Sequence, residues 1–216
     1  MTDEPLALTP ELLLQAYAAG IFPMGNEDNA QELYWVDPHE RGIIPLDGLH
    51  ISRSLRKTIR RGDFDIRIDH DFLGTMRDCA AREETWINDT ILDLYNALHK
   101  RNAAHSVEIW RDGQRIGGLY GVSIGAVFFG ESMVSHAPDA SKIALVWLVA
   151  RLRAGGYRLL DTQFTTSHLE SMGGVGISRA QYHKLLHSAL DTRADFHALE
   201  NGASMETILR LAQPTP

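Results

Sequence analysis

Apolar and polar residues follow helical spacing over the first part of the chain and strand spacing after His105. In the first part, the pattern predicts helices over residues 9–20, 52–61, 71–82 and 89–101. The earliest of these has Thr9 as a candidate N-cap, Pro10 in its first turn and Gly20 at its end. Residues 22–49 hold three of the eight prolines and show neither spacing, so we expect an irregular stretch there. The first 100 residues are therefore predicted to be mostly helix and loop.

After His105 the pattern predicts a sheet. Three strands are expected over residues 106–110, 115–122 and 126–129, and Asp112-Gly113 is typical of a tight hairpin turn between the first two. A helix over 140–154, a strand over 158–164 and a helix over 178–190 with Ser178 as its cap follow. This order predicts an α+β fold with a mainly antiparallel sheet, and it looks like the acyltransferase fold of the GNAT type.

Composition places the chain among ordinary globular proteins, because 44% of its residues are hydrophobic. The longest apolar run, residues 143–150, is far shorter than the roughly 20 residues that a membrane helix needs. The first ten residues lack the basic segment of a signal peptide. Cys79 is the single cysteine, which excludes an internal disulfide. We therefore expect a cytoplasmic protein that makes no contact with a membrane.

Charge is distributed unevenly along the chain. The net charge is −7, yet residues 49–62 carry five basic residues and no acid, which leaves −12 for the remainder. These five residues are Arg53, Arg56, Lys57, Arg60 and Arg61. A local basic surface of this kind is suited to nucleic-acid phosphates, even on an acidic protein. The alternative interpretation is a solvated helix face.

Motifs for phosphate or metal binding are weak. The glycine-rich segment 117–121 continues a strand and lacks the lysine of a phosphate-binding loop, which favours a role in strand packing. His183 and His187 lie four residues apart on a predicted helix, a spacing that can hold zinc, but no third ligand is evident. Cys79 lies beside two alanines in a predicted helix and is expected to be a core thiol.

An ordered series of short segments carries a family resemblance. The segments are YAAGIFPM at 17–24, YWVDP at 34–38, LHISRSL at 49–55, TWI at 85–87, HSVEIW at 105–110, GGLYG at 117–121, FFGESM at 128–133, ASK at 140–142, LDTQ at 160–163 and SHL at 167–169. Taken together and in this order, they resemble the leucyl/phenylalanyl-tRNA–protein transferase family over about residues 12–190.

The resemblance implies a fold and an activity. It implies a small N-terminal domain, placed at 1–62, followed by a GNAT-like domain at 63–216. The implied reaction moves leucine or phenylalanine from Leu-tRNA or Phe-tRNA to the N-terminal amine of proteins that begin with arginine or lysine, which tags them for degradation. The resemblance implies no metal and no acetyl-CoA, so we expect no cofactor.

Such a reaction is the aminolysis of an ester, which needs a neutral amine close to the ester carbonyl and a stabilised oxyanion. Asp161 and Gln163 lie two residues apart on a predicted strand and so share a face. By resemblance, both positions contact the reacting centre. We interpret Gln163 as an orienting hydrogen-bond partner and Asp161 as its polariser and the anchor of the incoming ammonium, and the proton acceptor can be either Asp161 or the tRNA ribose. Glu131, expected at a strand end, holds the acceptor's amine or neutralises its cationic first residue. Without the resemblance, these residues would be a turn-capping pair and a surface acid.

The remaining expected contacts are with the aminoacyl group and the tRNA. An apolar pocket is expected from Leu119, Phe128, Met133, Leu148, Leu152 and Leu160, which could equally be plain core. Trp86 matches a position that stacks on the terminal adenine, although a core tryptophan is the alternative. Met24 stands where many members have a second stacking tryptophan and could make a sulfur–aromatic contact. The five basic residues of 53–61 would bind tRNA phosphates.

Three other functions compete with this one. A related leucyl transferase acts on N-terminal aspartate or glutamate, and the acidic pair Glu131 and Asp161 disfavours it. A GNAT acetyltransferase would need a glycine-rich pyrophosphate loop before the helix at 140, and the sequence has none. A non-catalytic tRNA-binding module would tolerate loss of Asp161.

Overall fold

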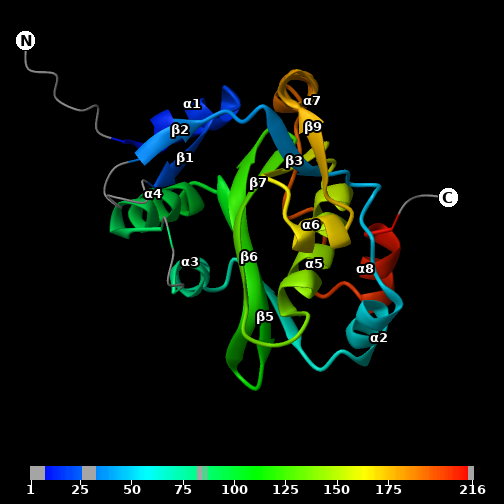
Figure 1. Ribbon diagram of the computed structural model, residues 1–216. Helices are drawn as coiled ribbons and strands as arrows, with labels where there is room; N and C mark the ends of the chain where they lie inside the picture. Colours follow the sequence, from blue (N-terminus) through cyan, green and yellow to red (C-terminus); the bar gives the residue numbers. More distant parts are fainter. Residues whose placement is uncertain (1–7, 26–32, 82–84, 86, 214–216) are drawn as a thin grey trace, which may run out of the picture.

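The computed structural model describes residues 8–25, 33–81, 85 and 87–213. A seven-stranded sheet in the order β4-β5-β6-β7-β8-β3-β9 runs through the centre of the molecule, with helices on both faces (Figure 1). The strands of the sheet are β3 (Glu40–Ile44), β4 (Asp65–Ile68), β5 (Ala104–Arg111), β6 (Gln114–Ile124), β7 (Val127–Ser135), β8 (Leu159–Gln163) and β9 (Val175–Ser178). Neighbouring strands are antiparallel except β7 and β8, which are parallel. The predicted α+β fold with a mainly antiparallel sheet is therefore confirmed.

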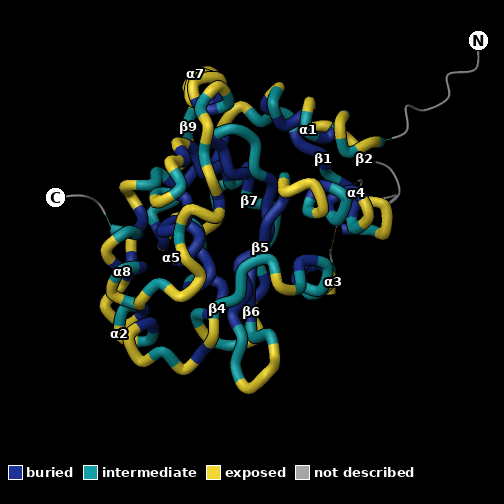
Figure 2. The backbone as a smooth tube through the Cα atoms, turned by 180° about the vertical axis from the view of Figure 1, so that it is seen from behind, coloured by how far each residue is buried: buried dark blue, intermediate teal, exposed yellow. Residues whose placement is uncertain are grey.

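Two groups of helices cover the two faces of the sheet. One face packs on α1 (Pro10–Ala18), α3 (Phe72–Ala80), α4 (Asp89–Lys100) and α7 (Arg179–Leu190). The other face packs on α2 (Arg53–Arg61), α5 (Ala140–Ala154) and α8 (Met205–Leu211). Each face has its own cluster of buried side chains, and Figure 2 shows the buried residues along the central strands and α5. The short helix α6 (Ser167–Ser171) follows β8.

Local sequence signals fix several helix ends and turns as predicted. The side chains of Thr9 and Ser52 accept hydrogen bonds from the backbone N–H groups of Leu12 and Leu55, both at 3.2 Å. Ser178 forms a reciprocal capping box at the start of α7. Asp112 and its glycine neighbour both have positive φ angles, of 50° and 75°, as the tight hairpin between β5 and β6 requires.

Helix α5 is buried on all sides because it lies between the sheet and helices α2 and α8. This position explains its unbroken apolar run, residues 143–150. Arg151 follows the run and is also buried, and its guanidinium donates to the carbonyl oxygens of Phe196 and Leu199, each at 2.9 Å. Within the described part of the chain, no helix has the length and apolar character to cross a membrane. Cys79 is buried in the core of the opposite face, as expected.

The expectation of an irregular stretch over 22–49 is wrong. This segment holds β1 (Phe22–Gly25) and β2 (Leu33–Val36), which pair with each other, and β3, which pairs with both β8 and β9. Strand β3 is buried along almost its whole length and therefore shows no alternation of apolar and polar residues. The short edge strand β4 was also not predicted, so the first 100 residues are not only helix and loop.

Later elements also differ from the prediction. Strand β7 continues to Ser135 instead of ending at residue 129, and β9, α6 and α8 were not predicted. Polar residues at 130–132 hid the second half of β7, while β9 and α6 bury few side chains. The division into domains 1–62 and 63–216 stays a prediction, and β3 from the first of these segments shares the main sheet with the second.

Candidate active site

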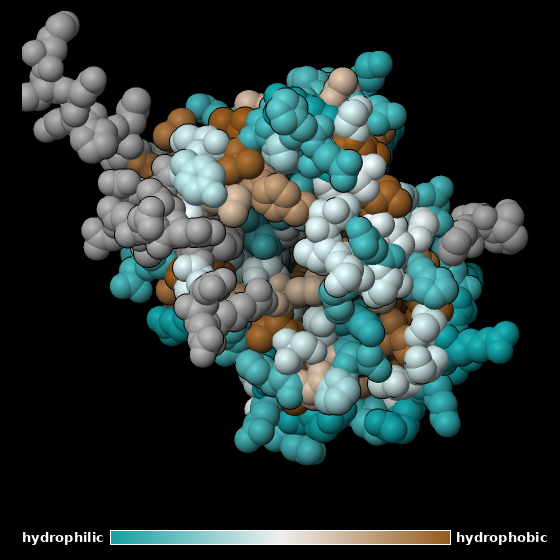
Figure 3. All heavy atoms as spheres, viewed as in Figure 1, coloured by the Kyte–Doolittle hydropathy of each residue, from teal (hydrophilic) through white to brown (hydrophobic). Residues whose placement is uncertain are grey.

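The parallel strands β7 and β8 separate, and a cavity opens between them. Their ladder pairs only residues 127–129 with 159–161, after which β7 continues to Ser135 and β8 ends at Gln163. A cavity of about 500 Å³ lies beside this point. Figure 3, which has the same view as Figure 1, shows a hollow near the centre of the molecule. Its lining residues come from β6, β7, α5, β8 and α6.

The lining of the cavity combines apolar and polar side chains. Leu119, Met133, Leu148 and Leu160 line it as the sequence predicted, together with Leu145. The predicted wall residues Phe128 and Leu152 are fully buried in the adjoining core and do not line the cavity. The polar part of the lining includes Glu131, Ser132, Thr162 and His168. Such a cavity can hold an apolar side chain beside polar reacting groups.

The sequence predicted that Glu131 lies at a strand end, but the residue lies inside β7. Strand β6 pairs Tyr120 with Ser132 and Gly121 with Gly130, so Glu131 is the extra residue of a β-bulge. The bulge changes the alternation of the strand: Phe129 packs with the α1–α4 face, whereas Met133 packs with the α5 face. The Glu131 side chain can therefore reach both the cavity and the tyrosines of α1 and α4, which are Tyr17 and Tyr95.

Hydrogen-bond donors surround the Glu131 carboxyl group. The Tyr95 hydroxyl donates to its Oε2 and the Gln163 amide donates to its Oε1, both at 3.1 Å. The Tyr95 hydroxyl also makes a short contact with the hydroxyl of Tyr17. Burial raises the pKa of Glu131 to about 8, although the two tyrosines partly oppose the shift. This carboxyl group can therefore gain or lose a proton close to neutral pH.

Asp161 is fully buried, and three protein groups donate four hydrogen bonds to its carboxylate. Arg41 binds both oxygens, with Nε 2.9 Å from Oδ1 and Nη2 2.6 Å from Oδ2. The Tyr182 hydroxyl and the backbone N–H of Gln163 complete the set at 2.7 and 2.8 Å. The role as a direct anchor for an incoming ammonium does not fit this arrangement, because no carboxylate position is open. Asp161 instead holds the backbone of Gln163.

Gln163 has an unusual backbone conformation, with a φ of 57°. The register between β3 and β8 shifts at this point, so that Gln163 pairs with Gly42 and Asp161 with Ile43. A Cβ atom on Gly42 would lie 2.4 Å from the carbonyl carbon of Phe164, so only glycine fits there. A strained residue that its neighbours hold in place is common at functional sites. The structure therefore brings Asp161, Gln163 and Glu131 together, as the sequence predicted.

Sequence reasoning missed the residues that support this trio. Arg41 and Tyr182 lie far from Asp161 along the chain, and no local pattern connects them. Tyr17 belongs to one of the matched segments, which was the available signal for it. His168, in another matched segment, has a buried Nε2 with no hydrogen-bond partner among the described residues. Burial, and then Lys142, lower the pKa of His168, which favours the neutral ring.

Comparison with known proteins decides the family. A protein-family model described as leucyl/phenylalanyl-tRNA protein transferase matches residues 43–187, and the model of its N-terminal domain matches residues 7–39. The chain belongs to the leucyl/phenylalanyl-tRNA protein transferase family. Enzymes of this family are aminoacyltransferases whose substrates are an aminoacyl-tRNA and a protein.

Curated relatives of the same name match almost the whole chain. The leucyl/phenylalanyl-tRNA–protein transferase of Cereibacter sphaeroides strain ATCC 17023 is 55% identical over 193 residues, which is 89% of this chain and 90% of that protein. The protein of the same name from Ruegeria sp. strain TM1040 is 56% identical over 191 residues, 88% and 91% of the two chains. That from Roseobacter denitrificans is 52% identical over 208 residues, 96% and 99% of the two chains.

Solved structures resemble the chain only weakly. The structure of L-PGS from Bacillus licheniformis is 14% identical, with a TM-score of 0.42, and covers 74% of this chain and 55% of that one. A likeness at this level shows neither the fold nor the function.

Among the described residues that are expected to bind tRNA in a leucyl/phenylalanyl-tRNA protein transferase, none lines the cavity. Met24 is in β1, where the Tyr34 hydroxyl lies 3.9 Å from its sulfur, and it does not line the cavity. Trp86 lies outside the described residues. Helix α2 lies on the same side of the sheet as α5 (Figure 1).

The basic residues of α2 are not equivalent. Arg60 pairs with Glu206 at 2.9 Å, and Arg61 pairs with Asp63. Arg56 donates to the backbone carbonyl of residue 51 at 3.2 Å. Arg53 and Lys57 are exposed, and among the described residues no acidic group forms an ion pair with either. These two residues are therefore the most available for phosphate contacts.

Proposed function

We propose that the chain transfers leucine or phenylalanine from aminoacyl-tRNA to the N-terminal amine of proteins that begin with arginine or lysine, which marks them for degradation in the cytoplasm. The observation that carries this proposal is the presence of Glu131 in the lining of a cavity that also has an apolar wall of leucines and methionine. The aminoacyl side chain would lie against Leu119, Met133 and Leu148, which places its ester near Glu131 and Gln163.

Glu131 suits the deprotonation of an N-terminal amine. A peptide α-ammonium has a pKa of about 8, and burial brings Glu131 to about the same value. Proton transfer from the ammonium to the Glu131 carboxylate is therefore nearly balanced, which is favourable for a general base. The neutral amine then attacks the ester carbonyl carbon. A C–N bond forms, the bond to the ribose oxygen breaks, and that oxygen takes the proton held by Glu131. The attacking nitrogen then loses a second proton to the Glu131 carboxylate, from which it passes to solvent, so that the products are an amide and a ribose hydroxyl.

Gln163 fits the role of an orienting donor. One N–H of its amide donates to Glu131, and the second remains for the carbonyl oxygen of the ester, where negative charge develops. Asp161 acts through Gln163 by binding its backbone N–H. We infer that Asp161 is a positioning residue and that Glu131 and Gln163 are the groups that touch the substrates.

The charge at the cavity supports a basic acceptor. Glu131 is the one carboxylate among the described lining residues, and neither lysine nor arginine lines the cavity. The chain as a whole has a net charge of −7, which favours the approach of a cationic first residue. An N-terminal aspartate or glutamate would meet a carboxyl group without a compensating cation, which disfavours the related leucyl transferase activity.

The fold and the tRNA contacts are also part of the proposal. The separating parallel strands β7 and β8 support a GNAT-like domain, although no glycine-rich loop for acetyl-CoA precedes α5. Exposed Arg53 and Lys57 on α2 would contact tRNA phosphates, with the other three basic residues beside them. Stacking of the terminal adenine on Trp86, with or without Met24, stays a prediction.

A transfer assay tests the proposal. Radiolabelled Leu-tRNA is incubated with peptides that differ only in their first residue, which is arginine, lysine, aspartate or glutamate. We expect label on the arginine and lysine peptides and none on an N-acetylated arginine peptide, because its amine is blocked. Label on the aspartate and glutamate peptides alone would support the related leucyl transferase, and no transfer to any peptide would disprove the activity.

A further inference from the structure

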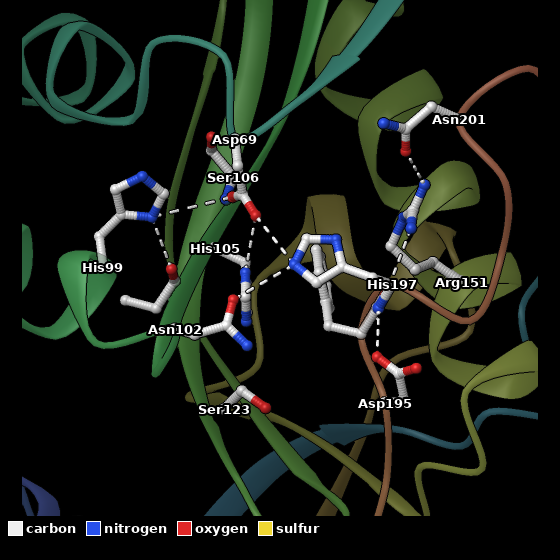
Figure 4. Close-up of polar contacts among 12 residues, drawn as sticks. Asp69, His99, Asn102, His105, Ser106, Ser123, Arg151, Asp195, His197 and Asn201 are labelled. Carbon is white, nitrogen blue, oxygen red and sulfur yellow. Dashed lines mark hydrogen bonds and ion pairs between the residues drawn. The ribbon is translucent and has the colours of Figure 1, made fainter.

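Three metal-ligating side chains converge at a place that the transfer reaction does not use. Asp69 follows β4, His105 lies in β5, and His197 lies between α7 and α8 (Figure 4). One ligand atom of each lies within 4.8 Å of the others. The shared atom is Asp69 Oδ2, which is 2.8 Å from Nδ1 of His105 and 3.6 Å from Nε2 of His197.

We propose that Asp69, His105 and His197 form a binding site for one Zn²⁺ ion. Two imidazole nitrogens and a carboxylate oxygen are a common zinc donor set. With bonds of about 2.0–2.1 Å, tetrahedral ligand atoms lie roughly 3.4 Å apart, and the two observed separations fall on either side of this value. The His197 side chain is 45% exposed, so a water molecule can take the fourth position from the solvent side.

Neighbouring groups hold the ligands in place. The backbone N–H of Ser106 donates to Oδ1 of Asp69 at 2.7 Å, which leaves Oδ2 toward the two imidazoles. Asp69 has a left-handed backbone with a φ of 55°, and its carboxylate lies against His105 and Ser106 at the start of β5. The His105 ring stacks on Phe196, with ring centroids 4.0 Å apart and planes within 11°. Asn102 Oδ1 lies 3.3 Å from His197 Nε2, and this contact gives way when Nε2 binds the ion, because a metal-bound nitrogen has no proton to donate.

The site is separate from the active site. None of its three residues lines the cavity, and His197 lies beyond residue 187, where the family match ends. The ion would join the end of β4, the start of β5 and the segment that precedes α8. That segment also supplies the carbonyl groups of Phe196 and Leu199 that bind Arg151 of α5. The bound ion therefore fixes the C-terminal segment to the sheet and takes no part in aminoacyl transfer.

Zinc binding by the full chain tests the proposal. Because the chain has ten histidines, the protein is used without a histidine tag, freed of metal by a chelator and titrated with Zn²⁺ by isothermal titration calorimetry. We expect one ion per chain and a higher Tm when it is bound. His197→Ala should weaken Zn²⁺ binding at least tenfold and remove the rise in Tm. The His197 side chain is 45% exposed, so the variant should fold normally, which circular dichroism checks.

His136→Ala is the matched control. His136 Nε2 also lies 3.6 Å from a carboxylate oxygen, that of Asp78, and its side chain is 49% exposed, but it belongs to no three-ligand group among the described residues. This variant should bind Zn²⁺ as the unchanged protein does. The proposal is overturned if the unchanged protein binds no stoichiometric Zn²⁺, or if His197→Ala binds it with unchanged affinity. The assay needs no tRNA, so its failure would leave the proposed transferase activity untouched.

Discussion

Two carboxyl groups lie close together in the active site, and their surroundings suit them to different tasks. Burial raises the pKa of Glu131 to about 8, and the donors around its carboxyl group are neutral, so the group can exchange a proton near neutral pH. Asp161 forms an ion pair with the guanidinium of Arg41, and all the hydrogen bonds that its carboxylate accepts come from the protein. The first can act on a substrate, whereas the second stabilises the geometry of Gln163.

Glu131→Gln should alter how stability depends on pH. The pKa of Glu131 is about 8 in the folded protein, above its ordinary value of 4.5. Its contribution to stability is therefore full below about pH 4.5 and is lost as the pH rises through about 8. Glutamine does not titrate, so as the pH rises through this range the free energy of unfolding of the variant should increase by roughly 5 kcal/mol relative to that of the unchanged protein. Urea unfolding at several pH values measures the difference.

The matched control for this change is Glu170→Gln, on the exposed surface of α6. Its stability should follow that of the unchanged protein at every pH. Parallel stability curves for Glu131→Gln and the unchanged protein would show that the Glu131 pKa is not raised.

Asp161→Asn should destabilise the fold and slow transfer. The change leaves the buried Arg41 guanidinium without its counter-charge, which costs about 3–5 kcal/mol. It also weakens the contact that holds Gln163, so kcat should fall while KM for the charged tRNA changes little. Tyr182→Phe removes one hydrogen bond from the same carboxylate and should cost only about 1–2 kcal/mol. Equal losses in the two variants, or an unchanged kcat in Asp161→Asn, would contradict the positioning role.

Helix α5 serves two purposes along one buried surface. Leu148 lines the cavity, whereas Leu152, one turn later, packs wholly in the core. Both positions follow the same sequence spacing, which is why the sequence could not separate a pocket wall from core packing.

This pair offers a test of side-chain selection. Leu148→Ala should enlarge the cavity and favour phenylalanine over leucine about tenfold, because each methylene contact is worth about 1–3 kcal/mol. Leu152→Ala should lower the free energy of unfolding by about 2–5 kcal/mol and leave the preference between leucine and phenylalanine unchanged. Competition between Leu-tRNA and Phe-tRNA, with unfolding measured in parallel, distinguishes the two. A shift in preference in both variants would mean that Leu148 acts through the fold and not through contact.

Helix α2 presents its cations toward solvent while Leu55 and Ile59 anchor its other face. Lys57→Glu should weaken tRNA binding, and the slope of log affinity against log salt should fall by about 1. Lys184→Glu makes the same change of charge on α7, which lies at the opposite end of the molecule from α2 (Figure 1). That control should bind tRNA almost as before, and equal losses would show that only total charge matters.

At the scale of the whole molecule, the sequence predicted the parts that local patterns determine. Capping residues predicted the starts of helices, and the hairpin turn at Asp112 predicted the pairing of the central strands β5 and β6. The pairing of β3 with β8 joins segments about 120 residues apart, and no local pattern reveals it. The same holds for the ion pair of Arg41 with Asp161 and for the bulge that redirects Glu131. The family resemblance pointed to the residues that we propose react, Glu131 and Gln163, but not to the groups that hold them.

The separation of β7 from β8 has a consequence for which proteins can be modified. Beyond Phe129, the described residues give β7 only one neighbouring strand, β6, and its other flank borders the cavity. An acceptor polypeptide lying along that flank would bind through main-chain hydrogen bonds to β7, as an added strand does. Main-chain groups are common to all proteins, so selection would rest on the first residue alone, and the enzyme would recognise a position in the polypeptide and not a sequence.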